Sequence, residues 1–346
     1  MKYLLAYSVP LIGILGIYFQ GIWSYTLVMY VFVLIPILEH FLPIDASNYS
    51  EEELKNRLKN KLYNALLYLN IPIVYGCLYY TFSVVKSEQL SYFELIGIIL
   101  SLGIILGSNG INVAHELGHR KKLFERIFGK LLLIPSHYTH FFIEHNKGHH
   151  AHVATDQDPS SAILGQSIYS FWPQTVFGTY FKAWEINLAE LKKKGLGFFS
   201  FQNEMLLFTC AHLILIGIIG INLGLNAICL FLVSASIGAL LLETVNYIEH
   251  YGLVRKRNPS GNFERVLPKH SWNSNHLLGR LMLFELSRHS DHHYLASRKY
   301  QILRHHDDAP QMPTGYPGMI VLALFPPIWF RVMNRQLKKY ESIISA

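Results

Sequence analysis

Histidines concentrate in one short part of this sequence, at spacings that suit a metal site. Residues 112–152 hold eight of the eighteen histidines of the chain. Two pairs in this stretch are four residues apart and one more histidine follows the second pair: His115 and His119, then His145, His149 and His150. Residues four apart share one face of an α-helix, so each pair can direct two imidazoles at one point. This spacing predicts metal coordination.

Two further clusters bring the number of imidazoles above what one ion holds. RHSDHH at 288–293 supplies three, and NYIEHYG at 246–252 supplies one. Nine imidazoles are too many for one tetrahedral zinc and suit two metals with four or five nitrogens each. Iron, copper, zinc and nickel all accept imidazole, so ligand type leaves the metal open. The predicted ligands are His115, His119, His145, His149, His150, His250, His289, His292 and His293.

The same residues allow a zinc protease. HELGH at 115–119 fits HExxH, in which two histidines hold zinc and the glutamate, here Glu116, acts as base. Such an enzyme needs only one more ligand and gives the remaining clusters no role, so we rank it below a two-metal site. A metal transporter would place ionisable residues within the membrane spans, where this sequence has very few.

Acidic residues beside the clusters could accept the second ring N–H of a metal-bound histidine and so orient it. The candidates are Glu116, Glu144, Asp158, Glu249 and Asp291. For His137 and His140 we expect an outer or structural position, and for His212 a hydrogen bond to a neighbouring helix. Surface or hydrogen-bonded positions are expected for His40, His152, His270, His276, His305 and His306.

The composition around these residues is that of a membrane protein. Hydrophobic residues make up 51% of the chain, charged residues 15% and aromatic residues 14%. The net charge of +7 comes from basic residues between hydrophobic runs, which indicates topology signals and excludes a clustered nucleic-acid surface. The three cysteines form no CxxC pair, so we expect neither disulfides nor a rubredoxin-type module in this sequence.

The hydrophobic runs predict an all-α protein with six transmembrane helices and a cytoplasmic helical cap. About 20 apolar residues cross a bilayer once. Spans are expected roughly over residues 4–21, 24–42, 62–85, 93–114, 204–221 and 225–245. The cap would comprise residues 115–202 and 246–346, and the whole chain, 1–346, would form one domain. The apolar stretch 319–330 is too short to span and should lie in the interface or pack as a lid.

Lysine and arginine in the loops predict the orientation. The turns near residues 21, 86 and 222 carry almost no charge, whereas 115–202 contains ten lysines and arginines. The positive-inside rule then places both termini and every histidine cluster on the cytoplasmic side. We therefore expect a multi-pass protein of a bacterial-type inner membrane.

At the motif level the chain resembles the integral-membrane alkane 1-monooxygenases. Three histidine clusters alone are also typical of membrane desaturases, fatty-acid hydroxylases and xylene monooxygenases. NYIEHYG at 246–252 together with HSWNSN at 270–275 narrows the resemblance to the alkane enzymes, and it extends to PTGYPG at 313–318.

The resemblance implies a histidine-bound site with two iron ions that activates O2. The expected reaction is terminal hydroxylation of medium-chain n-alkanes to 1-alkanols, with electrons from rubredoxin and rubredoxin reductase upstream. A related membrane hydroxylase or desaturase acting on another lipophilic substrate is the alternative.

An alkane has no polar group and partitions into lipid, so we expect a tunnel from the bilayer to the histidines. Tyr30, Val31 and Phe32 are its expected lining. Because no cysteine pair, haem motif or flavin motif is evident, electrons must come from a partner. Basic residues at 120–122 and 255–257 are the expected docking sites for an acidic electron carrier.

Overall fold

The structure is a computed structural model that describes residues 2–344. Its ordered elements are helices, and within the described residues no β-strand occurs beyond two isolated bridges, Arg257 with Phe263 and Asn273 with Gln311. The all-α prediction is confirmed.

Six helical segments are long and apolar enough to cross a membrane. The first three spans each consist of consecutive shorter elements. The first combines η1 (Lys2–Tyr7) and α1 (Ser8–Phe19), and the second combines η2 (Gly21–Tyr25), α2 (Thr26–Met29), η3 (Tyr30–Leu34) and α3 (Ile35–Phe41). The third combines α5 (Leu62–Tyr68) and α6 (Asn70–Ser87). The other three are α7 (Tyr92–Ile105), η4 (Leu106–Ile111) and α8 (Asn112–Gly118) as one segment, then α13 (Glu204–Leu223) and α14 (Leu225–His250). The six predicted spans are confirmed, each with ends within a few residues of the expected ones.

The turns between paired spans form where the sequence allows unusual backbone. Gln20 and Gly21 have φ of 55° and 52°, and Gly224 has φ of 81°. Left-handed backbone is readily available to glycine, which lets a chain reverse within very few residues. Ser91 starts α7 with a capping box to Glu94. These local signals explain why the two uninterrupted apolar runs fold as hairpins.

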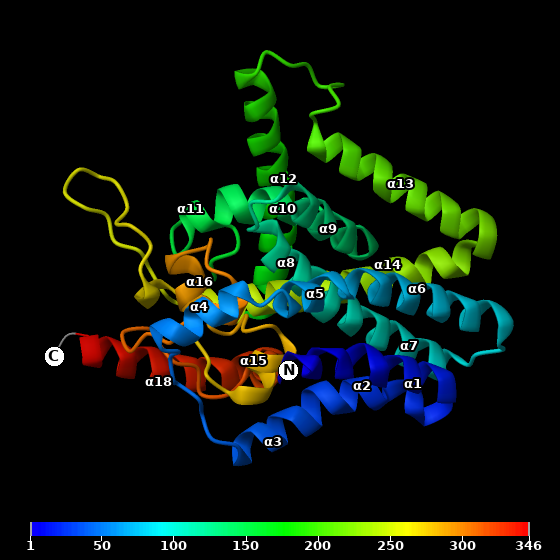
Figure 1. Cartoon of the computed structure of the whole chain (residues 1–346), viewed down its shortest axis with the longest axis horizontal. Helices are drawn as coiled ribbons and strands as arrows, with labels where there is room; N and C mark the ends of the chain where they lie inside the picture. Colours follow the sequence, from blue (N-terminus) through cyan, green and yellow to red (C-terminus); the bar gives the residue numbers. More distant parts are fainter. Residues whose placement is uncertain (1, 345–346) are drawn as a thin grey trace.

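The fourth span is the centre of the bundle and the fifth its periphery. Within an apolar stretch of 18 residues in each span, 72% of the residues are buried in the fourth span but only 11% in the fifth. Small residues let the fourth span approach α14 closely, since a Cβ on Gly238 would lie 3.1 Å from the Gly103 carbonyl oxygen. Figure 1 shows α13 standing apart from the other spans.

The remaining elements gather at one end of the bundle. They are α4 (Glu51–Lys59), α9 (Leu123–Leu133), η5 (Ile134–Ser136), α10 (Phe141–Glu144), η6 (His145–His149), α11 (His150–His152), α12 (Ile168–Lys193), η7 (Pro268–His270), α15 (Leu277–Met282), α16 (His289–Tyr294), η8 (Tyr300–Ile302), α17 (Tyr316–Ala323) and α18 (Pro326–Ile344). The end of α12 that leads to α13 projects away from the bundle (Figure 1), whereas its first turns pack against α14 through Phe171 and Tyr247. The N-terminal η1 reaches this end too, because the Tyr3 hydroxyl donates to Glu285 at 2.7 Å.

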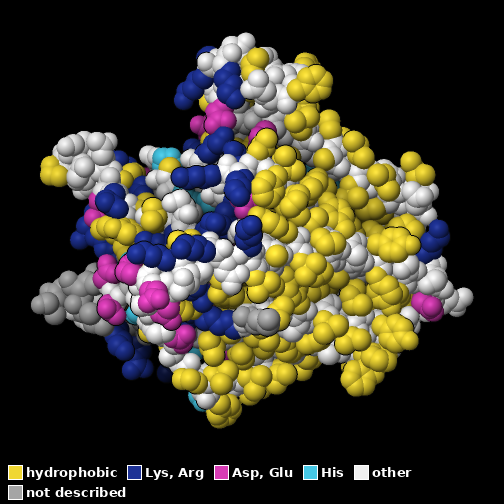
Figure 2. Space-filling view, in the orientation of Figure 1, with side chains coloured by type: hydrophobic (Ala, Val, Ile, Leu, Met, Phe, Trp, Pro, Cys, Tyr) yellow, Lys and Arg dark blue, Asp and Glu magenta, His cyan; other side chains and the backbone are white. Residues whose placement is uncertain are grey.

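The side chains on the surface differ between the spans and the end of the bundle where the other elements gather. Figure 2 shows a broad hydrophobic face over the spans, while charged side chains gather over the end that carries α4, α11 and α18. A band of exposed apolar side chains is stable only in lipid, so the protein is a multi-pass membrane protein.

The short apolar stretch 319–330 does not cross the bundle. It forms the end of α17 and the start of α18, with Met319 and Trp329 fully buried and Phe325 exposed. It packs against α14 in the second hydrophobic core, beside Tyr247. The predicted packing role therefore fits its position.

Candidate metal centre

The nine clustered histidines form two separate groups. In each group every residue offers a ring nitrogen within 4.8 Å of the others. The five-histidine group is His115, His119, His145, His150 and His292. The four-histidine group is His149, His250, His289 and His293. All nine residues that the spacing singled out are thus brought together, five around one point and four around another.

The second histidine pair does not behave as its spacing suggested. His115 and His119, at the end of α8, share a group as expected, but His145 and His149 fall into different groups. The reason is that η6 (His145–His149) is a π-helix. Its wider turn of i→i+5 hydrogen bonds brings His145 next to His150, whose Nε2 atoms are 3.0 Å apart, and turns His149 to the other group.

A short helix divides its histidines between the groups by ordinary α-helical spacing. On α16, His289 and His293 are four residues apart and belong to the four-histidine group, while His292 joins the other. His250 completes the four-histidine group from the last residue of α14. The membrane bundle thus supplies histidines to both groups, through α8 to one and α14 to the other.

The nitrogen spacing fits a coordinated metal. Ligands about 2.1 Å from one ion lie roughly 3.0 to 3.4 Å apart at right or tetrahedral angles. In the five-histidine group the Nε2 atoms of His115 and His292 are 3.0 Å apart and those of His119 and His145 are 3.2 Å apart. In the four-histidine group Nε2 of His149 lies 3.2 Å from that of His293.

Burial keeps the imidazoles ready to bind metal. It lowers the pKa of His119 to about 3 and holds the pKa values of His145, His150, His289, His292 and His293 well below 6.5. Neutral imidazole is the form that ligates metals. Closely spaced neutral nitrogens without an ion would face their lone pairs together, so this donor set indicates a metal site.

Two of the five expected acids lie against the four-histidine group. The Asp158 carboxylate is 2.9 Å from Nδ1 of His149 and also accepts from the Ser161 hydroxyl at 2.6 Å. Burial alone would raise the pKa of Asp158, but His149 and Ser161 lower it below its usual value. Glu249 Oε2 is 3.1 Å from Nε2 of His289, the nitrogen that also faces Nε2 of His250 at 3.3 Å, so it does not reach the outer ring nitrogen as expected. Its Oε1 accepts from the Tyr316 hydroxyl at 2.5 Å.

The other three acids do not contact the histidine groups as expected, and cations pair with two of them, Glu116 and Asp291. Glu116 pairs with Arg120 at 2.7 Å and accepts from the Tyr300 backbone N–H at 3.2 Å. This ion pair also leaves it poorly placed as the base of a zinc protease. Asp291 pairs with Arg298 and is 2.7 Å from Nε2 of His306. Glu144 is buried, and its Oε1 has no hydrogen-bond partner among the described residues.

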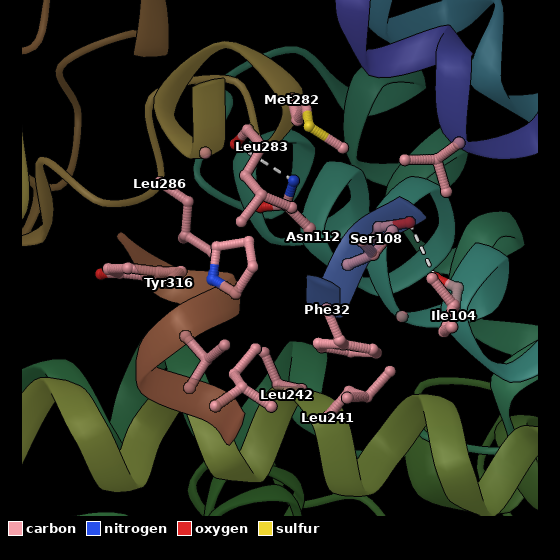
Figure 3. A pocket seen from close by; sticks show the side chains of 17 residues that line it. Phe32, Ile104, Ser108, Asn112, Leu241, Leu242, Met282, Leu283, Leu286 and Tyr316 are labelled. Atoms are coloured by element: carbon pink, nitrogen blue, oxygen red, sulfur yellow. Dashed lines mark hydrogen bonds between the residues drawn. The ribbon is translucent and has the colours of Figure 1, made fainter. Parts of the chain in front are cut away.

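An apolar cavity of about 70 Å³ lies in the bundle below the five-histidine group. Val31 and Phe32 line it as expected, whereas the Tyr30 hydroxyl lies 2.8 Å from that of Ser8 and Tyr30 is not among the lining residues. Figure 3 shows Leu241 and Leu242 of α14 across the cavity from Met282 and Leu283.

Asn112 marks the end of this cavity nearest the histidines. Together with Leu286 it also lines a narrow space of about 10 Å³ that touches His115 and His292. Its side-chain amide donates to the Leu283 carbonyl at 3.1 Å (Figure 3). The sequence reasoning did not single out Asn112 or Tyr316. A polar residue one turn before His115 on the same helix was the available signal for Asn112.

The other histidines lie outside both groups, and several of them form hydrogen bonds there. His270 is 3.1 Å from Glu264, His276 is 3.0 Å from the Ser274 hydroxyl, and Nδ1 of His305 accepts from Asn275 at 3.0 Å. His40 is exposed and His152 half-buried. Three more, His137, His140 and His212, line a second cavity. The predicted hydrogen bond of His212 to a neighbouring element is present, with Thr139 at 3.3 Å.

The sequence places the chain among known proteins. The model of the fatty acid desaturase family matches residues 92–323. An alkane 1-monooxygenase 1 from Pseudomonas aeruginosa is 42% identical over 92% of this chain and 84% of its own length. An alkane 1-monooxygenase from Acinetobacter baylyi is 40% identical over 88% of this chain and 74% of its own. A xylene/toluene monooxygenase hydroxylase component from Pseudomonas putida is 28% identical over 97% of the chain and 88% of its own.

Proposed function

The chain belongs to the fatty acid desaturase family and, within it, to the alkane 1-monooxygenases, and we propose that it converts medium-chain n-alkanes to 1-alkanols. The net reaction inserts one atom of O2 into a terminal C–H bond and reduces the other to water with two electrons and two protons. The enzyme is an oxidoreductase.

One observation carries this proposal: the apolar cavity shares lining residues with the space that touches His115 and His292. An alkane offers no hydrogen-bonding group, so only shape and apolar contact can align it. The cavity, of about 70 Å³ with Phe32 and Leu241 among its apolar lining residues, suits an unbranched chain. A chain held there with its end toward Asn112 would present its terminal methyl group to the five-histidine group.

The metals of the site would be two irons, one held by each histidine group. Bound there, two reduced irons would supply the electrons and open coordination positions for O2 activation. Five imidazoles would hold the ion nearer the cavity and four the other. Among the chain's own residues, Asp158 fixes the ring of His149, and Tyr316 holds Glu249 against His289. The apolar walls exclude water from the hydrocarbon.

Electrons would come from rubredoxin, supplied by rubredoxin reductase upstream. The basic surface that could receive it is smaller than the sequence suggested. Arg120 and Arg255 are buried, Arg120 in its ion pair with Glu116 and Arg255 donating to the Ala151 carbonyl at 2.8 Å. Because they are buried, Arg120 and Arg255 are no longer counted among the docking residues. The exposed cations are Lys121, Lys122, Lys256 and Arg257.

The proposed setting is a bacterial inner membrane, with both termini and the histidine groups on the cytoplasmic side. The excess of lysine and arginine at the histidine end supports this orientation. Histidines from residues 115 to 293 contribute to the two groups, which supports one domain over the chain. The similarity to a xylene/toluene monooxygenase component keeps another lipophilic substrate as the alternative.

The test is turnover of the purified, iron-loaded full chain in lipid nanodiscs with n-octane, NADH, rubredoxin reductase and rubredoxin. With ¹⁸O2 we expect octan-1-ol carrying one ¹⁸O, and metal analysis should give two irons per chain. Omitting rubredoxin should stop the reaction. One tightly held zinc with peptide hydrolysis, or hydroxylation of an aromatic methyl group without alkane turnover, would refute the proposal.

The contribution of the four exposed cations can be measured separately. Neutralising Lys121, Lys122, Lys256 and Arg257 should lower the rate at limiting rubredoxin and weaken its dependence on ionic strength. The matched control neutralises Lys192, Lys193 and Lys194 at the far end of α12. An unchanged rate would place rubredoxin on another surface.

A further inference from the structure

A second cavity, of about 600 Å³, lies between α12, α13 and α14. It shares no lining residue with the apolar cavity below the histidines. Small-molecule sites usually have volumes of about 300 to 1,000 Å³. Nothing in the proposed reaction uses this space.

The cavity has a polar floor and an apolar mouth. Ser136 and Thr139 on the floor are each 1% exposed, whereas Phe177 and Phe181 of α12 are 61% and 66% exposed. The opposite wall includes Phe208 of α13, the span with the least burial. The mouth therefore opens on the apolar surface, where a molecule would enter from lipid.

The floor holds a strained histidine whose ring nitrogen lacks a partner. His137 has φ of 53°, a left-handed backbone that a residue with a side chain seldom adopts. Its ring stacks on that of His212 with centroids 4.3 Å apart. Nε2 of His137 is buried without a hydrogen-bond partner among the described residues. Buried polar atoms are nearly always paired, so a ligand group is the expected partner.

The lining is polar but uncharged. It contains no lysine, arginine, aspartate or glutamate. Burial lowers the pKa of His140 to about 3 and also lowers the pKa of His137, so both are neutral near pH 7. A carboxylate or phosphate would find no cation here and would lose its hydration, whereas a hydroxyl could both donate and accept.

We propose that this cavity binds a linear 1-alkanol, with the hydroxyl group at Thr139, His137 and His212 and the chain directed toward Phe177 and Phe181. The inference rests on the proposed function in one respect: the enzyme would itself release such an alcohol into the surrounding lipid. The cavity would recognise the alcohol by its neutral hydroxyl group and its unbranched chain.

The experiment is photolabelling of the full chain in nanodiscs with a 1-dodecanol analogue that carries a diazirine near the far end of its chain. We expect labelled peptides around residues 177–181 or 205–212. Excess 1-dodecanol should prevent the labelling, while excess dodecane or dodecanoate should not.

Variants test the role of the floor. Thr139→Val and His212→Leu should each weaken labelling about 3- to 10-fold, the effect of losing one hydrogen bond. Ser236→Phe fills the cavity from α14 and should abolish labelling while the floor is kept. The matched control is Thr26→Val, because the Thr26 hydroxyl donates to the Trp23 carbonyl in the first hairpin, outside this cavity.

Several outcomes would overturn the inference. Equal protection by dodecane would indicate a crevice filled by any lipid chain, and equal protection by dodecanoate would show that head-group charge does not matter. Labelling confined to peptides of the apolar cavity would place the alcohol at the active site only.

Labelling needs neither metal nor turnover, so it separates the two proposals. An active enzyme without labelling refutes only the alcohol site, and a labelled protein without alkane hydroxylation refutes only the proposed reaction.

Discussion

The two histidine groups differ in how they are supported and in what they face. The five-histidine group touches the space that leads to the apolar cavity, and His119 and His150 in it are half-buried. The four-histidine group is fully buried, and carboxylates lie against two of its members, at His149 and His289. The first therefore lies nearer the apolar cavity, and in the second a carboxylate orients one ring, that of His149.

The difference between the two groups indicates how one metal site can be open to substrate on one side and fixed on the other. A group with five nitrogens can keep a metal although one side is open. A group with four nitrogens gains from outer partners that fix its rings, because such partners raise ligand basicity and orient the lone pair. The predictions below test this contrast, from the largest expected effect to the smallest.

Loss of one imidazole should stop catalysis in either group but release metal unequally. We expect His292→Ala and His293→Ala each to lower alkane hydroxylation more than about 100-fold, since a ligand matters more than the outer partners that orient it. His293→Ala leaves three nitrogens in its group and should lose that ion, whereas His292→Ala leaves four and should retain more metal. Metal content per chain measures this. Equal loss from both variants would contradict the contrast.

Removing a carboxylate should affect the four-histidine group alone. Asp158→Asn keeps the size of the side chain but removes the charge beside His149, and we expect a loss of about 10- to 100-fold in activity or metal affinity. The control is Asp156→Asn, whose side chain is 75% exposed. Activity equal to that of the control would show that Asp158 supports only its loop.

Bulk in the cavity should change which alkane is used while leaving the metals in place. Val31 is 9% exposed and lines the cavity, whereas Val33 is 41% exposed. Val31→Trp should shift the ratio of rates toward shorter alkanes by about 10-fold, since even one methylene in a tight pocket is worth this much. Val33→Trp should leave the ratio unchanged. The measurement is the product profile from a mixture of alkanes. An unchanged profile for Val31→Trp would show that the alkane binds elsewhere.

The π-helix that separates His145 from His149 should be sensitive to a single methyl group. A Cβ on Gly148 would clash with Oε1 of Glu144 and lie 3.1 Å from its Cδ. Because Glu144 is buried, its side chain has little room to move, and Gly148→Ala should destabilise the fold by about 1 to 3 kcal/mol. Gly76→Ala on α6 meets nothing within 4 Å and should stabilise it by about 0.5 to 1 kcal/mol. Thermal midpoints in detergent compare the two. A stable Gly148→Ala protein would mean that Glu144 moves freely.

Much of this protein followed from the sequence. Uncharged apolar runs determine six spans because a lipid environment requires every backbone hydrogen bond to be made within the segment. Histidine spacing paired His115 with His119 correctly, because an α-helix repeats every 3.6 residues, whereas the same argument for His145 and His149 was wrong. The number and type of donors pointed to more than one metal before any geometry was known.

Other features were decided only by the tertiary structure. The i, i+4 spacing of His145 and His149 does not reveal the π-helix that places them in different groups. Tyr316 reaches Glu249 from 67 residues away, and Arg120 is buried against Glu116 although its sequence neighbours Lys121 and Lys122 are exposed. Periodicity fixes which residues share a face. Which faces meet, and whether a charge meets water or a partner, depends on packing between segments far apart in the chain.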